Sequence, residues 1–379
     1  MGALMLVIGL GGGIRPAGAS VVSLEYRTQG PTADFKLPMG EREIRFKKEP
    51  AYKGTEIVRS LLPVSPDPKD VLGFACDTEE STLYLDLNRN LDLTDDPDGV
   101  VKAMGSGWGR SFENVVVTIE QEGRRRELVM DLESYGSRWG RYTVKSSWGA
   151  DAVRIGDRIY QVGVIDNGDG VITVEDTLYL QPAAGEFEAV DAESAGDEDE
   201  RVEIQAPSTL VLDGVPYRLA YELAEDGRSL ALSLEPGAED SLAEVELSGE
   251  GIQRIVLQDK ATAAVILAPG QALRIPAGNY RAELQVRMGS DEKHSLWNAW
   301  NVPLQAGREG SGIWRAGGPI TSKLSCRRFG ARLRFDQATV GAAGEKYREA
   351  GFHGISGGRP KLQVKKAGVI VHVGEFEYG

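Results

Sequence analysis

The sequence predicts an all-β protein with more than one domain. Short apolar stretches with period-two alternation recur along the chain, and turn residues separate them; the chain holds 47 glycines and 17 prolines. This pattern is typical of antiparallel strands joined by tight turns. A chain of 379 residues is also longer than one hydrophobic core usually organises. We therefore expect an N-terminal antiparallel β domain followed by two β-sandwich domains.

The first stretch has the features of a secretory signal peptide. Residues 1–14 are apolar and glycine-rich, and the small residues Ala17-Gly18-Ala19 before Ser20 form an A-x-A cleavage pattern. A basic n-region is missing, so either the true start lies upstream or the stretch is not a signal. We expect cleavage after residue 19 and a periplasmic or secreted mature protein. No other apolar run approaches the ~20 residues of a membrane span.

The predicted N-terminal domain covers residues 20–185, and an acidic linker at 186–203 follows it. The linker is rich in Glu, Asp, Ala, Ser and Gly, a composition typical of solvated segments. Period-two alternation predicts strands of the N-terminal domain within 21–45 and over 55–62, 71–77, 81–87, 115–121, 127–132, 141–146 and 158–165.

Two sandwich domains are predicted beyond the linker, over residues 204–305 and 306–379. Asp213-Gly214 and Asp226-Gly227 supply hairpin turns that need or tolerate positive φ. The predicted strands are 209–212, 217–223, 229–234, 243–247, 254–257, 263–267 and 280–287 in the first sandwich, and 320–327, 332–338, 362–365 and 369–376 in the second.

The clearest candidate site is an Asp-rich loop that follows the strand at 81–87. Numbered as an EF-hand loop, Asp86 stands at position one, Asn88 and Asn90 at positions three and five, and Asp92 at position seven. Oxygen ligands at alternate positions are how a short loop surrounds a calcium ion. The alternative is a series of Asx turns without an ion.

The second half of this loop departs from the EF-hand pattern. Position six is Leu91 instead of the usual Gly, and position twelve is Pro97 instead of a bidentate Glu. Asp95 or Asp96 would then supply the closing carboxylate. We expect a shortened loop that holds a structural Ca²⁺.

A second, weaker candidate loop follows the strand at 158–165. Asn167, Asp169 and Asp176 fall in EF-hand phase, but apolar Ile165 stands where the first ligand belongs. A plain hairpin at Gly168-Asp169-Gly170 explains the segment equally well. Thr-Leu-Tyr occurs in a strand beside each loop, at 82–84 and 177–179, which indicates two related half-motifs.

Several segments resemble known families. The loop at 86–96 resembles the shortened calcium loops of dockerins and thrombospondin type 3 repeats, over about a dozen residues. Pro276-Ala277-Gly278-Asn279-Tyr280 is similar to a turn of carboxypeptidase-regulatory-like sandwiches, which implies sandwiches of that type or of Ig-like type. Read whole, the chain resembles uncharacterised exported multi-domain β proteins of bacteria, and this resemblance implies no activity.

Charge and motifs argue against several functions. With 43 basic and 57 acidic residues the net charge is −14, which disfavours binding to nucleic acid or anionic lipid. The three histidines lack zinc-site spacing. Residues 354–358 come close to a G-x-S-x-G elbow, but the glycines and proline after the serine forbid the helix that an elbow needs. No catalytic residue is predicted.

The expected function is therefore a calcium-stabilised binding or structural module, with a glycan or another envelope or extracellular protein as its partner. The alternative is an enzyme acting on extracellular polysaccharide. Its cleft would lie near Trp108, Trp139 or Trp148, because exposed Trp side chains stack on sugar rings. The sequence leaves open whether Cys76 and Cys326 form a disulfide or are two free thiols.

Overall fold

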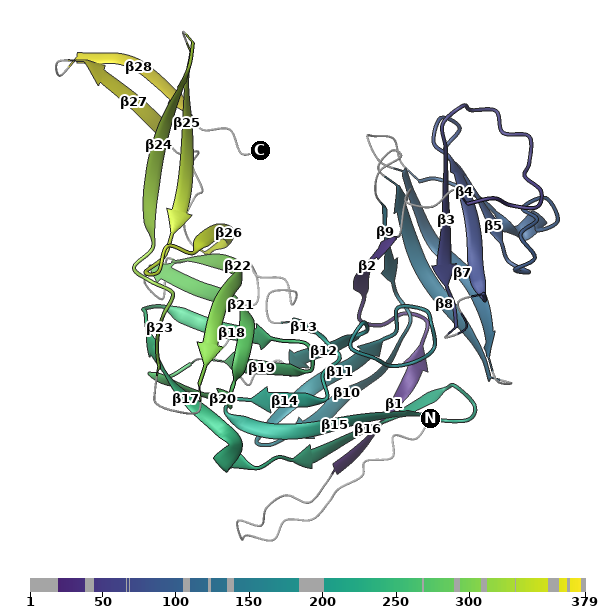
Figure 1. The fold of residues 1–379 in the computed structure, drawn as a ribbon, viewed down its shortest axis with the longest axis horizontal. Coiled ribbons are helices and arrows are strands. Elements are labelled where there is room, and N and C mark those ends of the chain that lie inside the picture. Colours follow the sequence, from purple (N-terminus) through teal and green to yellow (C-terminus); the bar gives the residue numbers. More distant parts are fainter. Residues whose placement is uncertain are drawn as a thin grey trace. The chain divides into compact units, whose positions relative to one another are not determined.

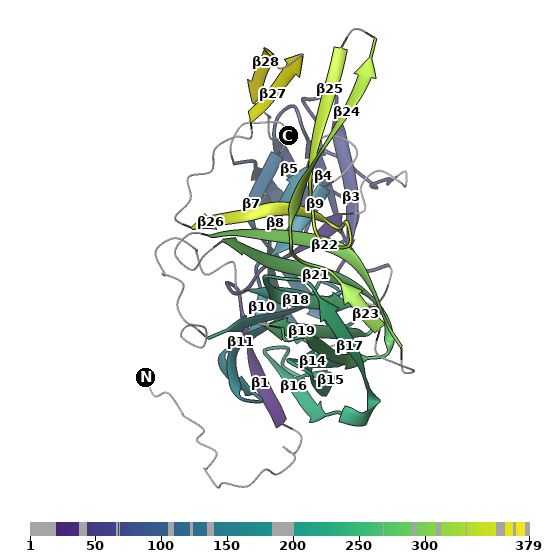
Figure 2. The ribbon, with the colours of Figure 1, turned by 90° about the vertical axis from the view of Figure 1, so that its left-hand side faces the viewer.

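The structure of the chain is a computed structural model, shown in Figures 1 and 2. In the part that it describes there are twenty-eight strands, two short 3-10 turns and no α-helix, so the all-β class is confirmed. The described residues are 20–37, 44–65, 67, 69–104, 110–121, 124–134, 140–183, 201–267, 269–289, 294–307, 312–330, 332–353, 361–366 and 369–375.

The chain forms two compact units. Unit 1 contains the described residues before Val190 together with Asp197–Ser241 and Gln258–Ala264. Unit 2 contains Leu242–Leu257 and Val265–Gly379. β19 (Thr262–Leu267) contributes residues to both units.

One layer of unit 1 is a long antiparallel sheet with β1 in its interior. β1 pairs with β10 on one side and with β16 on the other, and Ser20 lies opposite Leu234. The strands of this layer, in spatial order, are β13 (Val202–Gln205), β12 (Thr177–Pro182), β11 (Arg158–Ile165), β10 (Ser147–Ile155), β1 (Ser20–Arg27), β16 (Ser229–Pro236), β15 (Val215–Leu223) and β14 (Thr209–Leu212).

Two four-stranded sheets of unit 1 enclose a common core. Alternate residues of the strands point inward, as in β3, where buried and part-exposed positions alternate. The core contains Leu62, Phe74, Phe112, Met130 and Ile165, all buried. The strands are β3 (Ile57–Pro63), β4 (Val71–Asp77), β5 (Thr82–Asp86) and β6 (Val100–Lys102) in one sheet, and β2 (Ala33–Leu37), β9 (Gly140–Val144), β8 (Arg124–Ser134) and β7 (Arg110–Gln121) in the other.

Unit 2 consists of antiparallel strands, one small three-stranded sheet and a terminal hairpin. Its main strands are β18 (Ile252–Gln258), β21 (Gly278–Gly289), β22 (His294–Ala306), β26 (Lys346–His353), β25 (Arg332–Val340) and β24 (Thr321–Phe329). The three-stranded sheet contains β20 (Ala272–Pro276), β17 (Leu242–Ser248) and β23 (Gly312–Arg315), and the hairpin pairs β27 (Lys361–Lys366) with β28 (Val369–Glu375). Figure 2 shows β24 and β25 as a two-stranded ribbon that projects from the rest of the sheet.

Most predicted strands are found close to their predicted bounds. Asp213 and Gly214 adopt φ values of 48° and 84°, as the predicted turn requires, and Gly227 adopts 68°. Several strands were missed, among them β26, β13 and the two longest, β10 and β22. Both contain Trp residues that were assigned to packing or binding, and neither shows a clean alternation of polar and apolar residues.

The division of the chain differs from the predicted boundaries at 186–203 and 305. β13 pairs with β12, and β16 pairs with β1, so the strands over 202–236 belong to the same unit as the predicted N-terminal domain. The predicted signal peptide at 1–19 and residues 186–200 of the predicted linker lie outside the described residues.

Both cysteines are free thiols. Cys76 is buried in the core between the two four-stranded sheets, and this burial raises its pKa to about 12. A thiol with so high a pKa stays protonated and unreactive. Cys326 is exposed on β24.

Candidate functional site

The first Asp-rich loop begins where β5 ends. Asp86 is fully buried, and its two carboxylate oxygens accept the backbone N–H groups of Asn90 at 3.0 Å and of Leu91 at 2.8 Å. These bonds fold the loop back over the end of the strand. Burial raises the pKa of the Asp86 carboxyl above its usual value, and the negative charge of Asp95 adds to the rise.

Polar side chains at alternate positions close three successive turns of this loop. Asn88 Oδ1 accepts the N–H of Asn90 at 3.1 Å, and Asn90 Oδ1 accepts the N–H of Asp92 at 2.6 Å. Asp92 Oδ1 accepts the N–H of Thr94 at 2.9 Å. These are Asx turns, so the alternate spacing shapes the backbone itself. Each oxygen retains further acceptor capacity, which a cation could use.

The closing carboxylates differ in how they are satisfied. Asp95 accepts the side-chain amides of Asn88 at 3.1 Å and of Asn90 at 2.7 Å. Asp96 Oδ2 is buried and has no hydrogen-bond partner among the described residues. Burial raises the pKa of Asp96, and the charges of Asp86 and Asp95 raise it further. Three carboxylates therefore repel one another at this loop.

The loop accommodates both departures from the EF-hand pattern, which are Leu91 and Pro97. Leu91 adopts φ of 65°, the left-handed conformation for which glycine is usual, and Arg89 adopts 59°. The Leu91 carbonyl accepts the N–H of Lys47 at 2.8 Å, which ties the turn to a neighbouring segment. Pro97 starts the 3-10 turn Pro97–Gly99 and ends the loop directly after Asp96.

The second loop has the same design, but it starts one residue later than its EF-hand numbering predicts. Asp166, not Ile165, is the buried first residue, and its carboxylate accepts the N–H groups of Gly168 at 2.8 Å and of Gly170 at 3.2 Å. Asn167 and Asp169 then close Asx turns on the N–H groups two residues ahead, at 3.0 and 2.9 Å. The two loops are thus related in geometry, as the repeated Thr-Leu-Tyr indicates.

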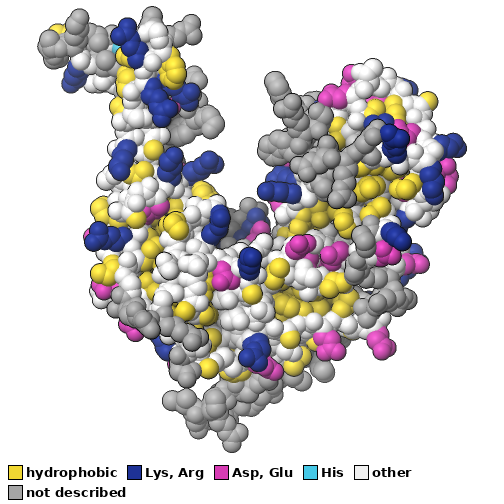
Figure 3. Space-filling model, in the orientation of Figure 1, with side chains coloured by type: hydrophobic (Ala, Val, Ile, Leu, Met, Phe, Trp, Pro, Cys, Tyr) yellow, Lys and Arg dark blue, Asp and Glu magenta, His cyan; other side chains and the backbone are white. Residues whose placement is uncertain are grey.

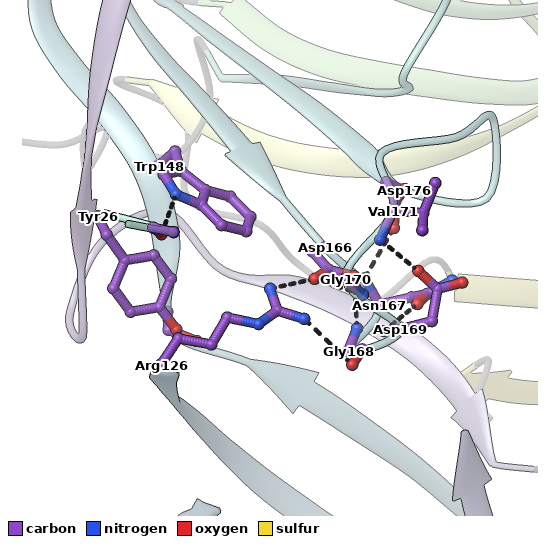
Figure 4. A network of polar contacts seen from close by, with 12 residues as sticks. Tyr26, Arg126, Trp148, Asp166, Asn167, Gly168, Asp169, Gly170, Val171 and Asp176 are labelled. Carbon is purple, nitrogen blue, oxygen red and sulfur yellow. Dashed lines mark hydrogen bonds and ion pairs between the residues drawn. The ribbon is translucent and has the colours of Figure 1, made fainter. Parts of the chain in front are cut away.

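Arg126 of β8 lies beside the second loop, between the loop and Trp148 (Figure 4). Its guanidinium forms an ion pair with Asp166 and donates to the Gly168 carbonyl at 3.2 Å. The same group lies over the Trp148 ring, 5.4 Å from the ring centroid. Arg126 and Asp166 are both buried, with exposed fractions of 9% and 2%. A side-chain cation therefore balances the charge of this loop.

Asp176 closes the second loop from the side facing away from Arg126. Its carboxylate accepts the N–H groups of Asn167 at 2.8 Å and of Thr173 at 2.5 Å, and Asp176 is fully buried. Burial raises its pKa to about 7, and the charge of Asp166 adds to the rise. The Asp176 carboxyl is therefore harder to ionise than an ordinary aspartate.

The two loops differ in their counter-charge. Among the described residues, no Lys or Arg forms an ion pair with Asp86, Asp95 or Asp96. Arg89 is turned elsewhere, to Asp70 at 2.8 Å and to a carbonyl of β7. In the first loop Lys48 pairs with Asp92 at 3.9 Å, but the buried Asp86 has no side-chain cation in the described part of the chain, whereas in the second loop Arg126 pairs with the buried Asp166.

Trp148 does not line a cleft. It is buried, with an exposed fraction of 1%, and its indole N–H donates to the Gly227 carbonyl at 3.1 Å. Tyr26 packs on it with the ring centroids 5.2 Å apart (Figure 4). Trp148 therefore belongs to the core and offers no face to a sugar. Trp108 and Trp139 lie outside the described residues.

The described histidines form no metal site. His294 is buried with its Nδ1 3.3 Å from a nitrogen of Arg287, and it lies in register with His353. His372 is exposed on β28. Across the described ranges, no three His, Cys, Asp or Glu side chains are arranged as metal ligands. The glycine-rich segment at 354–358 lies outside those ranges.

Comparisons of the chain with protein-family models, with curated proteins and with solved structures find no match. In the described part of the chain, no helix has the length and apolar character to cross a bilayer. The fold and the site therefore define an all-β protein of two units with two Asp-rich loops, each of which begins at a buried Asp.

Proposed function

We propose that the protein is an exported structural or binding module, stabilised by one calcium ion at the Asp86 loop. The observation that carries this proposal is the buried Asp96 oxygen without a hydrogen-bond partner, placed near the Asp86 and Asp95 carboxylates; among the described residues, the one cation paired with this loop is Lys48, which contacts Asp92. Calcium is bound by mixtures of carboxylate, amide and carbonyl oxygens with irregular geometry, and this loop offers such a mixture.

The loop carries the donor types that a hard divalent cation takes, but its carboxylates are not gathered as three metal ligands in the described structure, so the ion would have to draw them together. Asp86, Asp95 and Asp96 would supply carboxylate oxygens, and Asn88 and Asn90 would supply amide oxygens after rotation of the amides that now face Asp95. The ion would neutralise the repulsion between the carboxylates and pin the loop to the end of β5. We propose no ion at Asn167, Asp169 and Asp176, because Arg126 already supplies the positive charge there.

Export and the role as a module are supported by the signal-like stretch at 1–19 and by the absence of a predicted catalytic group. No observation on the described residues favours the polysaccharide-active enzyme, since the one Trp of the three that is described is buried. The binding or structural role therefore stands as the single proposal.

Calcium binding is tested by thermal unfolding in calcium and in chelator. We expect calcium at hundredfold its dissociation constant to stabilise unit 1 by about 2.7 kcal/mol, since only the folded loop gathers the ligands. Asp96→Asn should abolish most of this gain. In chelator the same variant should be more stable than the wild type, because it removes one of three repelling charges.

The matched control is Asp98→Asn, which removes an exposed carboxylate two residues away. This variant should keep the full calcium response. A wild-type midpoint that is the same in calcium and in chelator would rule out the structural ion, and so would an unaltered calcium response in Asp96→Asn.

A further inference from the structure

β24 is an edge strand with both faces in solvent. It pairs with β25 along all nine residues, and it stands last in its sheet, so no described strand pairs with its other edge. All of its residues are exposed. The other edge of β25, by contrast, is paired in part, because Thr339 and Val340 pair with β26. A two-stranded ribbon of this kind is marginal in water on its own.

One face of the ribbon is basic. Alternation places Lys323 and Arg327 on the same face of β24, and the register puts Arg334 directly opposite Arg327. Lys346 joins them around a hollow of about 620 Å³. Arg334 pairs with Asp336 at 2.9 Å, but Lys323, Arg327 and Lys346 have no ion pair among the described residues. Lys and Arg side chains gather visibly over this ribbon in Figure 3.

The opposite face carries apolar side chains at its centre, with Gln337 opposite Leu324 and with Arg328 toward one end. Leu324 and Cys326 alternate with the basic residues on β24, and Phe335 and Leu333 stand in register with Cys326 and Arg328. Leu324 and Leu333 are 54% and 56% exposed. Positive charge on an edge strand is a known protection against unwanted pairing. Protection against strand pairing does not explain why Leu324 and Leu333 are exposed on this ribbon. Exposed apolar side chains favour the strand pairing that the charges would prevent.

The positive charges of β24 indicate which kind of partner can pair with its edge. A second copy of β24 would bring its Lys323 and Arg327 next to the same residues of the first copy, and like charges opposed across a ladder are unfavourable. A nucleic acid would use the basic face and leave the apolar face uncovered. A strand whose side chains alternate between acidic and apolar satisfies the backbone edge and both faces together.

We propose that β24 is a docking edge for an extended peptide with alternating acidic and apolar side chains. The peptide adds as an antiparallel or parallel strand. Its carboxylates lie beside Lys323 and Arg327, and its apolar side chains cover Leu324 and Cys326. This inference names the partner of the proposed binding module and does not depend on calcium.

The test is fluorescence anisotropy of the full chain with a labelled Glu-Val alternating peptide, about eight residues long to match a strand. We expect saturable binding by the wild type, no binding of the Lys-Val counterpart, and weaker binding of a Glu-Ser peptide that lacks apolar side chains. The double variant Lys323→Glu, Arg327→Glu should lose roughly tenfold or more in affinity for Glu-Val and gain affinity for Lys-Val. Leu324→Asp should also weaken binding.

The matched control is Arg281→Glu, which reverses an exposed charge elsewhere in unit 2 and should bind as the wild type does. Equal affinities for Glu-Val and Glu-Ser would show a plain polyanion surface and overturn the proposal. So would a dimer in sedimentation that dissociates when the two charges are reversed, since a second copy would then occupy the edge. All titrations are run in calcium and in chelator: unchanged peptide binding beside a failed calcium response would disprove only the calcium loop.

Discussion

Arg126→Met should destabilise unit 1 by about 3 to 5 kcal/mol, because it leaves the buried Asp166 carboxylate without its counter-charge. Methionine retains most of the apolar stem over Trp148, so the loss reports mainly on charge. Urea unfolding followed by circular dichroism measures the effect, and the transition that shifts identifies unit 1.

Two further variants separate charge from packing. Arg125→Met removes the exposed neighbour on the same strand and should change stability by no more than about 0.5 kcal/mol. Arg126→Met combined with Asp166→Asn removes both charges and should recover a large part of the loss. If the double variant were as unstable as Arg126→Met alone, packing and not charge would be the cause.

The stability of unit 1 should fall as pH rises from about 4 to about 7, through the titration of Asp176. Its folded pKa, about 7, lies above the value of about 3.9 in the unfolded chain, so the folded state binds the extra proton in this window. Protonation therefore favours folding at low pH, and this contribution is lost as pH passes the folded pKa. At 1.36 kcal/mol per pKa unit, the change is on the order of a few kcal/mol.

The measurement is the urea midpoint of the unit 1 transition as a function of pH, in chelator. Asp176→Asn cannot titrate and should flatten the profile between pH 5 and 7, although it weakens one of two backbone bonds. Asp336→Asn, a carboxylate variant in unit 2, should leave the profile unchanged. A wild-type midpoint that rises with pH over this window would refute the raised pKa.

Most strands of the fold could be predicted from local sequence patterns. Alternation located the majority of strands, and Asp213-Gly214 located a turn, because pleat and turn chemistry are properties of a few neighbouring residues. The division into units was not accessible in this way. One of the two strands that pair with β1 is β16, and nothing in the sequence of either segment indicates that they pair.

The site was accessible in part. The ligand-like spacing at Asp86 follows from sequence, but the uncompensated Asp96 oxygen is a property of packing. Arg126 did carry a signal that was missed. Leu128, Met130 and Leu132 are alternate residues of β8 whose side chains point toward the core. Arg126 lies two residues before Leu128, so its side chain also points inward. An inward arginine must find a buried acceptor, which here is Asp166.

The interior position of β1 has a consequence for the order of folding. Leu24 of β1 cannot gain its neighbour Leu230 until a segment roughly 200 residues later has left the ribosome, and closing so long a loop is slow. Until then, the sheet that contains β10 to β12 is incomplete, because the side of β1 that later pairs with β16 is unpaired.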